Sequence, residues 1–479
     1  MCLGLVLGIG LGAAGCRKKP DLLVDIKERR SFQSRVQAAV RANHEQRCPR
    51  PVLSGEANDS RAAPFIVSLA ESTPASKRCL EVVRQRQPAL VAALFYDDKQ
   101  RPTGYPDRFV SRPFHGVGQS EVAVVAVARA CGVAVERLRK FVSTRDGCSP
   151  YRPGVRCNAK WISVLLVAKG VAAQARQALI NGRKRKGLHL LLDLLRLSQD
   201  LERGGTSWMV SNVAHGVAEI ALPLLERALS ETAGLTPAIL ADVSRQLSVL
   251  LNSEPHPAEA LRGEYLSVIL ETVLPQFAPK SWRPPGVGCE VKMPAPKASR
   301  RERRSVEAWQ DVWALHALVF EQIARDMGLV CPASATPQFC VQALERLTVR
   351  YEKLGARSFP RLQSRLSSAT ARRRDPGFAE LMGLPGSNAR LVAMGSRRRV
   401  FLAGLLLSTA YRELVLQRKA CLGVAVFDEE PLKSLRRDPY SDKRLAVVQV
   451  AQGRFLVQSP DLIRSAGADK APAVVISCR

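Results

Sequence analysis

The sequence is short of aromatic side chains, of acidic residues relative to basic ones, and of histidine. Aromatic residues make up only 5% of the 479 residues, so a core must be built mainly from leucine, valine, alanine and isoleucine, as in helical bundles. Hydrophobic residues make up 46%, which excludes a wholly disordered chain. The length exceeds one typical core and predicts two or three domains.

The deficit of acidic residues leaves a strongly basic chain. Lys and Arg number 72 against 43 Asp and Glu, which gives a formal charge of +29 and a pI near 10.2. Such a surface attracts polyanions: nucleic acid, acidic lipid, anionic cell-wall polymer or lipopolysaccharide. Arginine outnumbers lysine threefold, and alanine, glycine and leucine are abundant. A GC-rich genome produces the same skew without any partner, and this alternative stays open.

Signatures of chemistry are also missing. The sequence contains no Walker A loop, no HExxH helix and no GxSxG elbow. It has no CxxC pair and no His at ligand spacing from two Cys, which argues against zinc. A GxGxxG pattern spans Gly10–Gly15, but a dinucleotide site needs a preceding strand and an acidic residue on a second strand. We therefore predict no catalytic residue, no metal and no cofactor.

The N-terminus carries the most specific pattern in the chain. Residues 1–15 are uncharged and end in the small residues Ala13, Ala14 and Gly15, directly before Cys16. As a helix they would span about 22 Å, too short for a hydrocarbon core of ~30 Å. The segment resembles the bacterial lipoprotein signal, in which a lipobox of small residues precedes a Cys that becomes the lipidated N-terminus.

This resemblance implies an address and an anchor. Cleavage would fall between Gly15 and Cys16, and Cys16 would receive the acyl chains that tether the protein to a membrane. Arg17 is not the Asp that holds relatives in the inner membrane, so the outer membrane of the cell envelope is favoured. The alternative is an ordinary buried hydrophobic N-terminus.

The cysteines agree with export. Of 12 in total, ten follow Cys16, and an even number of scattered Cys suits an oxidising compartment. Cys148 and Cys157 bracket one Pro-containing loop, and Cys331 and Cys340 bracket another. We expect disulfides to close these loops, each adding roughly 2–3 kcal/mol of stability. Free buried thiols are the alternative.

The body is predicted to be mainly α, an antiparallel bundle of stacked helices with a small C-terminal antiparallel β element. The expected segments are a signal peptide at 1–15, a tether and mixed region at 16–118, a helical domain at 119–277, a Pro-rich basic linker at 278–304, a second helical region at 305–420, and a β region at 421–479.

Two helices of the body carry polar residues at helical spacing. Around 187–201 nearly every residue between the polar positions is Leu, so this helix must be buried on most of its circumference. Its polar stripe comprises His189, Asp193, Arg196 and Asp200. The next helix aligns Asn212, His215, Glu219 and Glu226. Thr236 followed by Pro237 predicts the start of a further helix, and later helices are expected at 338–354 and 398–418.

The last 60 residues change to β-branched, partly alternating runs separated by turn residues, which predict strands. The segment 400–479 resembles the C-terminal end of pseudopilin-like domains. Asp438-Pro439-Tyr440-Ser441 and Phe455–Ser459 match the turn and the hairpin of that pattern. The resemblance implies a helix followed by this turn and a short hairpin. A prepilin signal and the Asp-rich calcium-binding tail are missing, so neither pilus assembly nor calcium binding is expected.

Four basic runs complete the picture: Arg183–Lys186, Arg300–Arg304, Arg372–Arg374 and Arg397–Arg399. We interpret them as solvated helix ends or loops rather than anion sites. Aromatic residues are not interleaved with them, which argues against nucleic acid as a partner.

Three functional hypotheses remain. The first is a lipid-anchored, non-enzymatic envelope protein that contacts a protein, an anionic lipid or a cell-wall polymer. The second is an envelope enzyme whose site is assembled from distant residues. The third is a cytoplasmic nucleic-acid binder whose N-terminus only mimics a signal.

Overall fold

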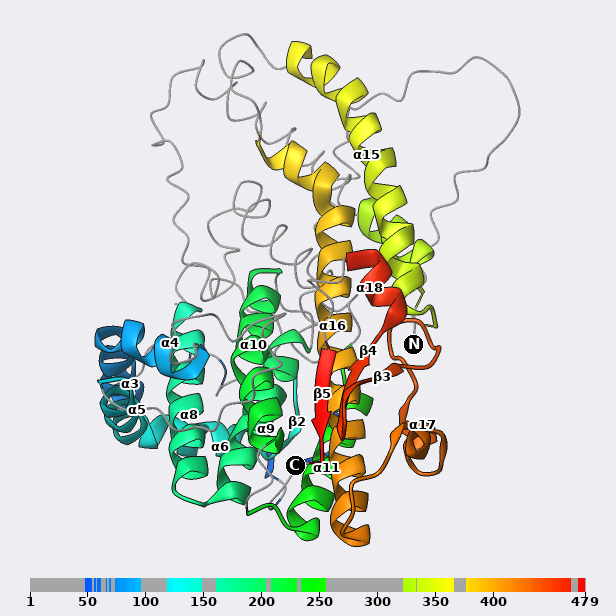
Figure 1. Ribbon diagram of the computed structural model, residues 1–479. Helices are drawn as coiled ribbons and strands as arrows, with labels where there is room; N and C mark the ends of the chain where they lie inside the picture. Colours follow the sequence, from blue (N-terminus) through cyan, green and yellow to red (C-terminus); the bar gives the residue numbers. More distant parts are fainter. Residues whose placement is uncertain are drawn as a thin grey trace.

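The structure is a computed structural model, and it describes residues 48–53, 56, 58–61, 66, 69, 74–95, 119–148, 161–203, 208–230, 234–255, 322–332, 334–365, 376–466 and 473–478. Within these ranges the chain is mainly helical, with a small antiparallel sheet near the C-terminus (Figure 1). The predicted fold class is confirmed.

The body of the fold is a stack of helices around α9. Their bounds are α3 Pro74–Gln85, α4 Gln87–Phe95, α5 Gln119–Ala130, α6 Gly132–Val142, α8 Ile162–Ile180, α9 Lys184–Glu202, α10 Trp208–Ser230 and α11 Pro237–Asn252. Helix α9 contacts α6, α8, α10 and α11, and α8 contacts α3 and α5 on its other side. As predicted, Thr236 caps α11: its Oγ1 accepts a hydrogen bond from the backbone N–H of Ile239 at 3.3 Å, with Pro237 in the first turn.

Helix α9 is buried over its whole circumference. Every residue from Gly187 to Glu202 is buried, including the four polar residues that the sequence places on one stripe. The leucines between them pack on all neighbouring helices because α9 has a partner on each side. The polar stripe must therefore find its hydrogen-bond and ion partners inside the protein.

Two long helices follow the body, α15 Pro337–Arg365 and α16 Pro376–Arg418. The second half of α16, from Val400 to Tyr411, lies in the same hydrophobic core as the body. Its first half packs on α15 and on the helical residues 322–330 to form a second, smaller core. The boundary expected at 420 is thus crossed by the main core, which continues from the body through α16 into the C-terminal sheet.

Helix α16 begins at 376 rather than at the predicted 398, and α15 ends at 365 rather than at 354. The segment 376–397 contains Pro385 and several glycines, residues that weaken helical propensity. Packing against α15 offsets this weakness, which a propensity argument cannot anticipate.

The C-terminal region is built from short elements: η4 Val424–Asp428, α17 Leu432–Leu435, β3 Ala446–Ala451, β4 Arg454–Gln458, α18 Pro460–Ala466 and β5 Ala473–Ser477. The three strands form an antiparallel sheet in the order β3-β4-β5, at the positions that the sequence predicts. A second pairing joins β1 Asn58–Arg61 to β2 Thr144–Asp146 in parallel.

The sheet is fastened to α16 by close packing. A Cβ on Gly404 would lie 2.7 Å from a methyl group of Val474, so glycine is required for the approach of helix and strand. Tyr411 of α16 stacks on Phe427 with ring centroids 5.1 Å apart, and Phe455 of β4 meets both rings edge-on.

The Asp438-Pro439-Tyr440-Ser441 segment forms a turn that Asp438 closes from inside. The buried carboxylate accepts hydrogen bonds from the backbone N–H of Tyr440 at 2.9 Å and from the hydroxyls of Ser441 at 2.8 Å and Ser459 at 2.6 Å. Because Ser459 begins the turn after β4, this carboxylate connects the two ends of the hairpin region.

One helix in the described part of the chain is long and apolar enough to span a bilayer, Gly383–Arg418 of α16. In its most apolar window 67% of the residues are buried inside the fold, and the helix carries Arg397, Arg398 and Arg399 in its middle. Its apolar side chains are occupied by α10, α11 and the sheet. These contacts are those of a core helix.

All eight cysteines within the described residues form disulfides. The pairs are Cys48–Cys148, Cys79–Cys131, Cys331–Cys340 and Cys421–Cys478. The pair Cys331–Cys340 is the one expected from the bracketed loop. The expected pairing of Cys148 with Cys157 is wrong, because the short strand β2 brings Cys148 against Cys48 instead. Cys157 itself lies outside the described residues.

We predict that the Cys79→Ala/Cys131→Ala variant loses about 4 kcal/mol of unfolding free energy. The bridge closes 52 residues, and loop entropy sets this magnitude. Both sulfurs are buried against Gly170 of α8, where a Cβ would lie 2.4 Å from Cys131 Sγ. Denaturant titration measures the loss. Cys331→Ala/Cys340→Ala, which opens only nine residues, should lose about 2–3 kcal/mol; equal losses would contradict the prediction.

Candidate functional site

Buried polar side chains gather on two sides of α9. One group faces α10, α11 and α16, and a second faces the segment 48–53 that lies across the end of the body. Charged groups inside a protein are stable only when they are paired and hydrogen-bonded. The partners of each side chain therefore decide what the two groups can do.

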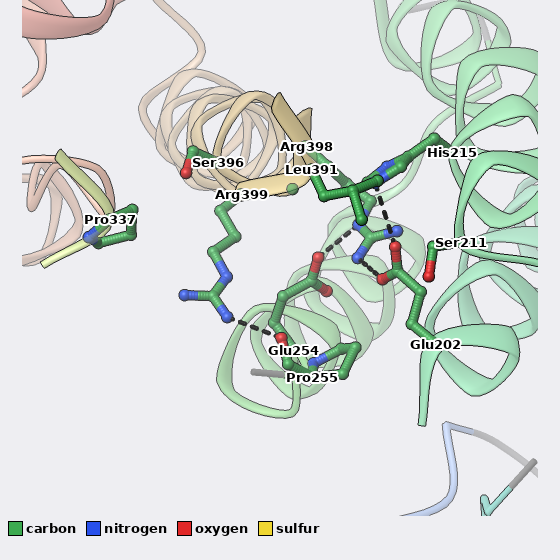
Figure 2. A pocket seen from close by; sticks show the side chains of 11 residues that line it. Glu202, Ser211, His215, Glu254, Pro255, Pro337, Leu391, Ser396, Arg398 and Arg399 are labelled. Carbon is green, nitrogen blue, oxygen red and sulfur yellow. Dashed lines mark hydrogen bonds and ion pairs between the residues drawn. The ribbon is translucent and has the colours of Figure 1, made fainter. Parts of the chain in front are cut away.

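Arg398 of α16 is the centre of the first group (Figure 2). Its guanidinium donates to the carboxylates of Glu202 on α9 and Glu254 just beyond α11, and its Nη1 donates to Ser198 Oγ at 2.8 Å. The exposed fractions of the Arg398 and Glu254 side chains are 3% and 2%. Burial alone would lower the pKa of Arg398, but the two carboxylates raise it above its ordinary range. The cation is therefore permanent.

His215 of α10 adjoins the same carboxylate. Its Nε2 lies 3.2 Å from Glu202 Oε1, on the side of Glu202 that Arg398 leaves open. Burial, and then the Arg398 cation, lower the pKa of His215 to about 3. The imidazole is neutral at physiological pH, so its approach to Glu202 is a polar contact and not a second ion pair.

A small cavity lies beside this cluster. Its lining comprises Glu202, Ser211, His215, Glu254, Pro255, Pro337, Leu391, Gly395, Ser396, Arg398 and Arg399. Its volume is about 30 Å³, enough for one or two water molecules. Ser211 Oγ is buried without a hydrogen-bond partner in the described part of the chain, and Arg399 donates to the Pro255 carbonyl at 3.0 Å. The described lining thus has room for water, not for an organic substrate.

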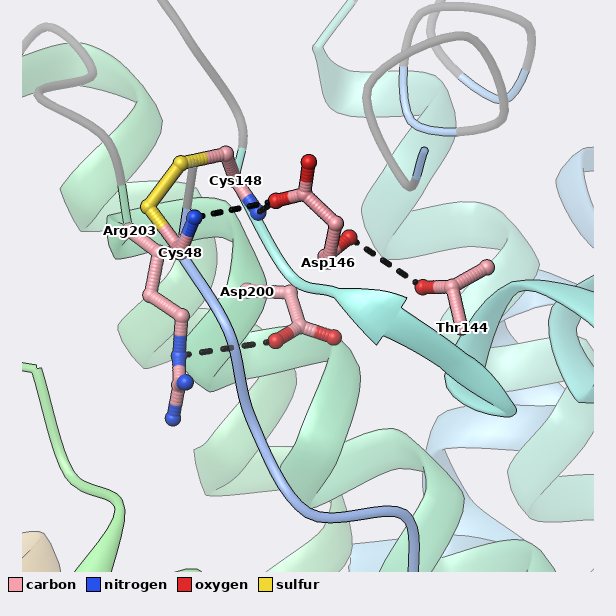
Figure 3. The surroundings of a disulfide bond; sticks show 6 residues. All are labelled: Cys48, Thr144, Asp146, Cys148, Asp200 and Arg203. Atoms are coloured by element: carbon pink, nitrogen blue, oxygen red, sulfur yellow. Dashed lines mark hydrogen bonds and ion pairs between the residues drawn. A yellow bond between two sulfur atoms is a disulfide. The ribbon is translucent and has the colours of Figure 1, made fainter. Parts of the chain in front are cut away.

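The second group fixes the segment 48–53 to the body. Arg50 Nη2 lies 3.0 Å from Asp200 Oδ2, and both side chains are fully buried. Arg203 approaches the other oxygen of Asp200 at 3.6 Å (Figure 3). Arg50 also donates to the carbonyls of Phe141 and Val142 at the end of α6. Because these carbonyls carry the negative end of a helix dipole, they add to the stabilisation of the cation.

The Cys48–Cys148 disulfide lies close to the Asp200–Arg203 pair (Figure 3), and Cys48 is two residues before Arg50 in the chain. Asp146 of β2 accepts hydrogen bonds from the backbone N–H groups of Cys48 at 3.1 Å and Cys148 at 3.2 Å. A Cβ on Gly147 would lie 2.4 Å from Arg50 Cδ, so only glycine lets the arginine cross here. A covalent bond and a buried ion pair therefore hold the same segment.

The rest of the α9 stripe is paired more weakly. His189 Nε2 lies 2.7 Å from Asp242 of α11. Asp193 is buried, and Arg139 Nε lies 3.7 Å from its Oδ2 on a side chain that is half-exposed. Burial raises the pKa of Asp193 to about 7, although Arg139 and Arg196 act in the opposite direction. Its charge at neutral pH is therefore only partly compensated.

Chemically, the cavity collects two carboxylates, an imidazole and two hydroxyls, the residue types from which hydrolytic sites are built. Each carboxylate is already engaged. Glu202 is shared by Arg398 and His215, and Glu254 by Arg398 and Gln199. A general base needs a carboxylate or imidazole with a free lone pair aimed at a substrate. The pairing fits an ion-pair network that joins helices better than it fits a catalytic centre.

The residues that the sequence singled out fall in different places. Gly15, Cys16 and Cys157 lie outside the described residues. Arg183–Lys186 stands at the exposed start of α9, as expected. The interpretation of Arg397–Arg399 as a solvated run is wrong, because the run lies mid-helix and Arg398 is buried between two carboxylates.

Sequence reasoning missed Arg50, Glu254 and Arg398. The sequence does contain a signal for Arg398. It lies just before the apolar run Val400–Leu407, and a helix with such a run must be buried. For Arg50 and Glu254 no local signal exists, since both lie in irregular segments whose ion-pair partners are more than 140 residues away in the sequence.

Compared with known proteins, the chain matches no protein-family model, no curated protein sequence and no solved structure. The functional argument therefore rests on the residues and on their geometry.

We predict that Arg398→Met lowers the free energy of unfolding by about 3–5 kcal/mol at pH 7, because two buried carboxylates lose their cation. Denaturant titration by circular dichroism measures the change. Arg390→Met, at an exposed position on the same helix, should change it by less than about 0.5 kcal/mol. Equal stability of the two variants would contradict the prediction, because the ion pairs of Arg398 would then contribute nothing to the free energy of unfolding.

We further predict that Asp193→Asn flattens the pH dependence of stability. The folded-state pKa of about 7 exceeds the ordinary value of 3.8, so the folded form binds the proton more tightly. This contribution is fully present below about pH 4 and is lost as pH rises through about 7. Thermal unfolding at pH 5 and pH 8 should show a smaller loss for Asp193→Asn than for wild type; an unchanged difference would refute the assignment.

Proposed function

We propose that the chain is a lipid-anchored protein of the bacterial cell envelope whose helical body is a non-enzymatic interaction or structural unit. The anchor is Cys16, freed by cleavage after Gly15, and the outer membrane is favoured over the inner one because Arg17 follows the cysteine. Its partners are the membrane itself, an anionic lipid or cell-wall polymer, and a protein still to be found.

The observation that carries the proposal is the pairing of the cysteines. Every cysteine in the described ranges lies in a disulfide, and three of the four bridges join residues 52, 57 and 100 positions apart. Cytosolic reductants keep such thiols reduced, whereas the bacterial periplasm oxidises them. Long-range disulfides therefore support export, and export is what the lipoprotein-like segment 1–15 implies. They weigh against a cytoplasmic nucleic-acid binder.

The attachment of residues 48–53 supports a tethered arrangement. This segment is the first described part of the chain after the proposed anchor at Cys16, and it is held by the Cys48–Cys148 bridge and the Arg50–Asp200 ion pair. A domain that is attached to a membrane through its N-terminal segment must keep that segment bound to the rest of the fold. The disulfide at this segment supplies that resistance.

An envelope enzyme is the second candidate, and the cavity beside Arg398 is the observation that favours it. Glu202, Glu254, His215 and Ser211 converge there. The small volume of the cavity and the pairing of both carboxylates with Arg398 favour a structural role for this cluster. A hydrolytic activity abolished by Ser211→Ala, with unfolding free energy unchanged, would reverse this preference.

We expect Cys16→Ala to abolish membrane attachment through acyl chains. Wild-type protein expressed in a diderm bacterium should require detergent for extraction, and mass spectrometry should find an acylated N-terminal peptide that begins at Cys16. The variant should lack the acylated peptide. Recovery of a non-acylated Met1 peptide from the soluble fraction of wild-type cells would refute the anchor.

Thiol alkylation separates location from anchoring. In non-reduced, denatured protein taken from cells, the eight described cysteines should resist the alkylating reagent and become reactive only after reduction. Cys16→Ala should show the same protection if export continues without lipidation. Fully reactive thiols would place the protein in the cytoplasm and favour the nucleic-acid alternative.

A further inference from the structure

The helices α15 and α16 form an arm whose upper part rises from the body (Figure 1). The first half of α16, α15 and residues 322–332 share a core of their own, which includes Leu344, Leu347 and Tyr351 of α15. The Cys331–Cys340 bridge ties the base of this arm. One side of α15 is thus buried, and the opposite side faces outward.

The outward side of α15 carries a row of cations. Arg346, Arg350 and Lys353 are exposed and are spaced four and three residues apart. We call these three residues the basic stripe. At 1.5 Å per residue the stripe covers about 10 Å of helix.

Helix geometry keeps the charges together. At about 100° per residue, Arg346, Arg350 and Lys353 fall within about 60° of one another. The carboxylates of Glu345 and Glu352 lie roughly a third of a turn away and are exposed on their own edge. Glu345 lines the same shallow hollow as Arg346 and offsets part of its charge there, but between 345 and 353 three exposed cations outnumber two exposed carboxylates.

Apolar side chains accompany the stripe. Phe339 is 51% exposed about two turns before it, and Val349, beside it, is 49% exposed. A shallow hollow beside Val349 is lined, among the described residues, by α15 alone. Cations and exposed apolar side chains on one helix are the combination that a helix in a membrane interface uses.

We propose that the basic stripe of α15 binds the surface of an anionic phospholipid bilayer, with Phe339 and Val349 entering the headgroup layer. Arginine and lysine side chains pair with lipid phosphates, and each contributes to binding in proportion to the negative surface potential. The proposal deepens the proposed function and rests on it: a chain held near a bilayer by Cys16 would lay this arm on the bilayer surface.

The observations favour lipid over nucleic acid. A single-stranded nucleic acid would need aromatic side chains distributed along the charges, and Phe339 is the one aromatic residue on this side of the helix between 337 and 357. An aliphatic Val349 among the cations gains nothing from a phosphate backbone, but it gains from burial among acyl chains. Duplex DNA is therefore tested as the competing ligand in the experiment below.

The test uses the full chain carrying Cys16→Ala, so that acyl chains play no part. Its sedimentation with vesicles of neutral phosphatidylcholine is compared with that on vesicles containing 30 mol% phosphatidylglycerol. The stripe variant is Arg346→Glu/Arg350→Glu/Lys353→Glu. The matched control, Arg78→Glu/Arg84→Glu/Arg86→Glu, makes the same change of net charge at exposed positions on and just after α3, away from the arm (Figure 1).

We expect binding to the anionic vesicles only, weakened by salt, and a loss of about 100-fold in the stripe variant. The control should lose far less, and both variants should unfold at the wild-type temperature because all six positions are exposed. Equal losses in the two variants, or equal binding to neutral vesicles, would overturn the proposal. Tighter binding to duplex DNA than to the anionic vesicles, lost in the same variant, would assign the stripe to nucleic acid. Acylation of Cys16 is read separately by mass spectrometry, so either conclusion can fail without the other.

Discussion

The buried guanidinium of Arg398 is the interaction on which the rest of the fold depends. It links α16 to α9 through Glu202 and to the end of α11 through Glu254, whose side chains are only 12% and 2% exposed. Without it, these two carboxylates would face α16 with their negative charges uncompensated. Because the same helix supports both the C-terminal sheet and α15, this ion-pair cluster connects the three parts of the described structure.

Helical periodicity and β-branched alternation carried most of the fold. The leucine repeat of α9, the Thr236-Pro237 cap and all three C-terminal strands stand where local patterns put them. Local patterns failed where tertiary packing decides the outcome. The Pro- and Gly-containing first half of α16 is helical because α15 covers it, and Cys148 pairs with Cys48 because a short strand crosses from a distant segment.

The candidate site was predictable only in part. The polar stripe of α9 predicted buried charges, because a helix made mostly of leucine leaves no solvent-exposed face for Asp193 or Asp200. The partners could not be named, since Arg50 and Arg398 come from segments about 150 and 200 residues away in the sequence and no spacing rule connects them. Composition alone was also insufficient. The excess of arginine predicts a basic surface, but some of these arginines are buried in ion pairs inside the protein.

Helix α16 is one uninterrupted rod that takes part in two separate cores. Its rotational phase is therefore fixed at both ends, by Val392 in the small core and by Val400–Leu407 in the large one. Inserting or deleting one residue between them would turn one end by about 100° against the other, and neither core could readjust. The segment 393–399 should thus tolerate changes of side chain at its half-buried positions better than any change of length, because its length sets the rotation of one core against the other.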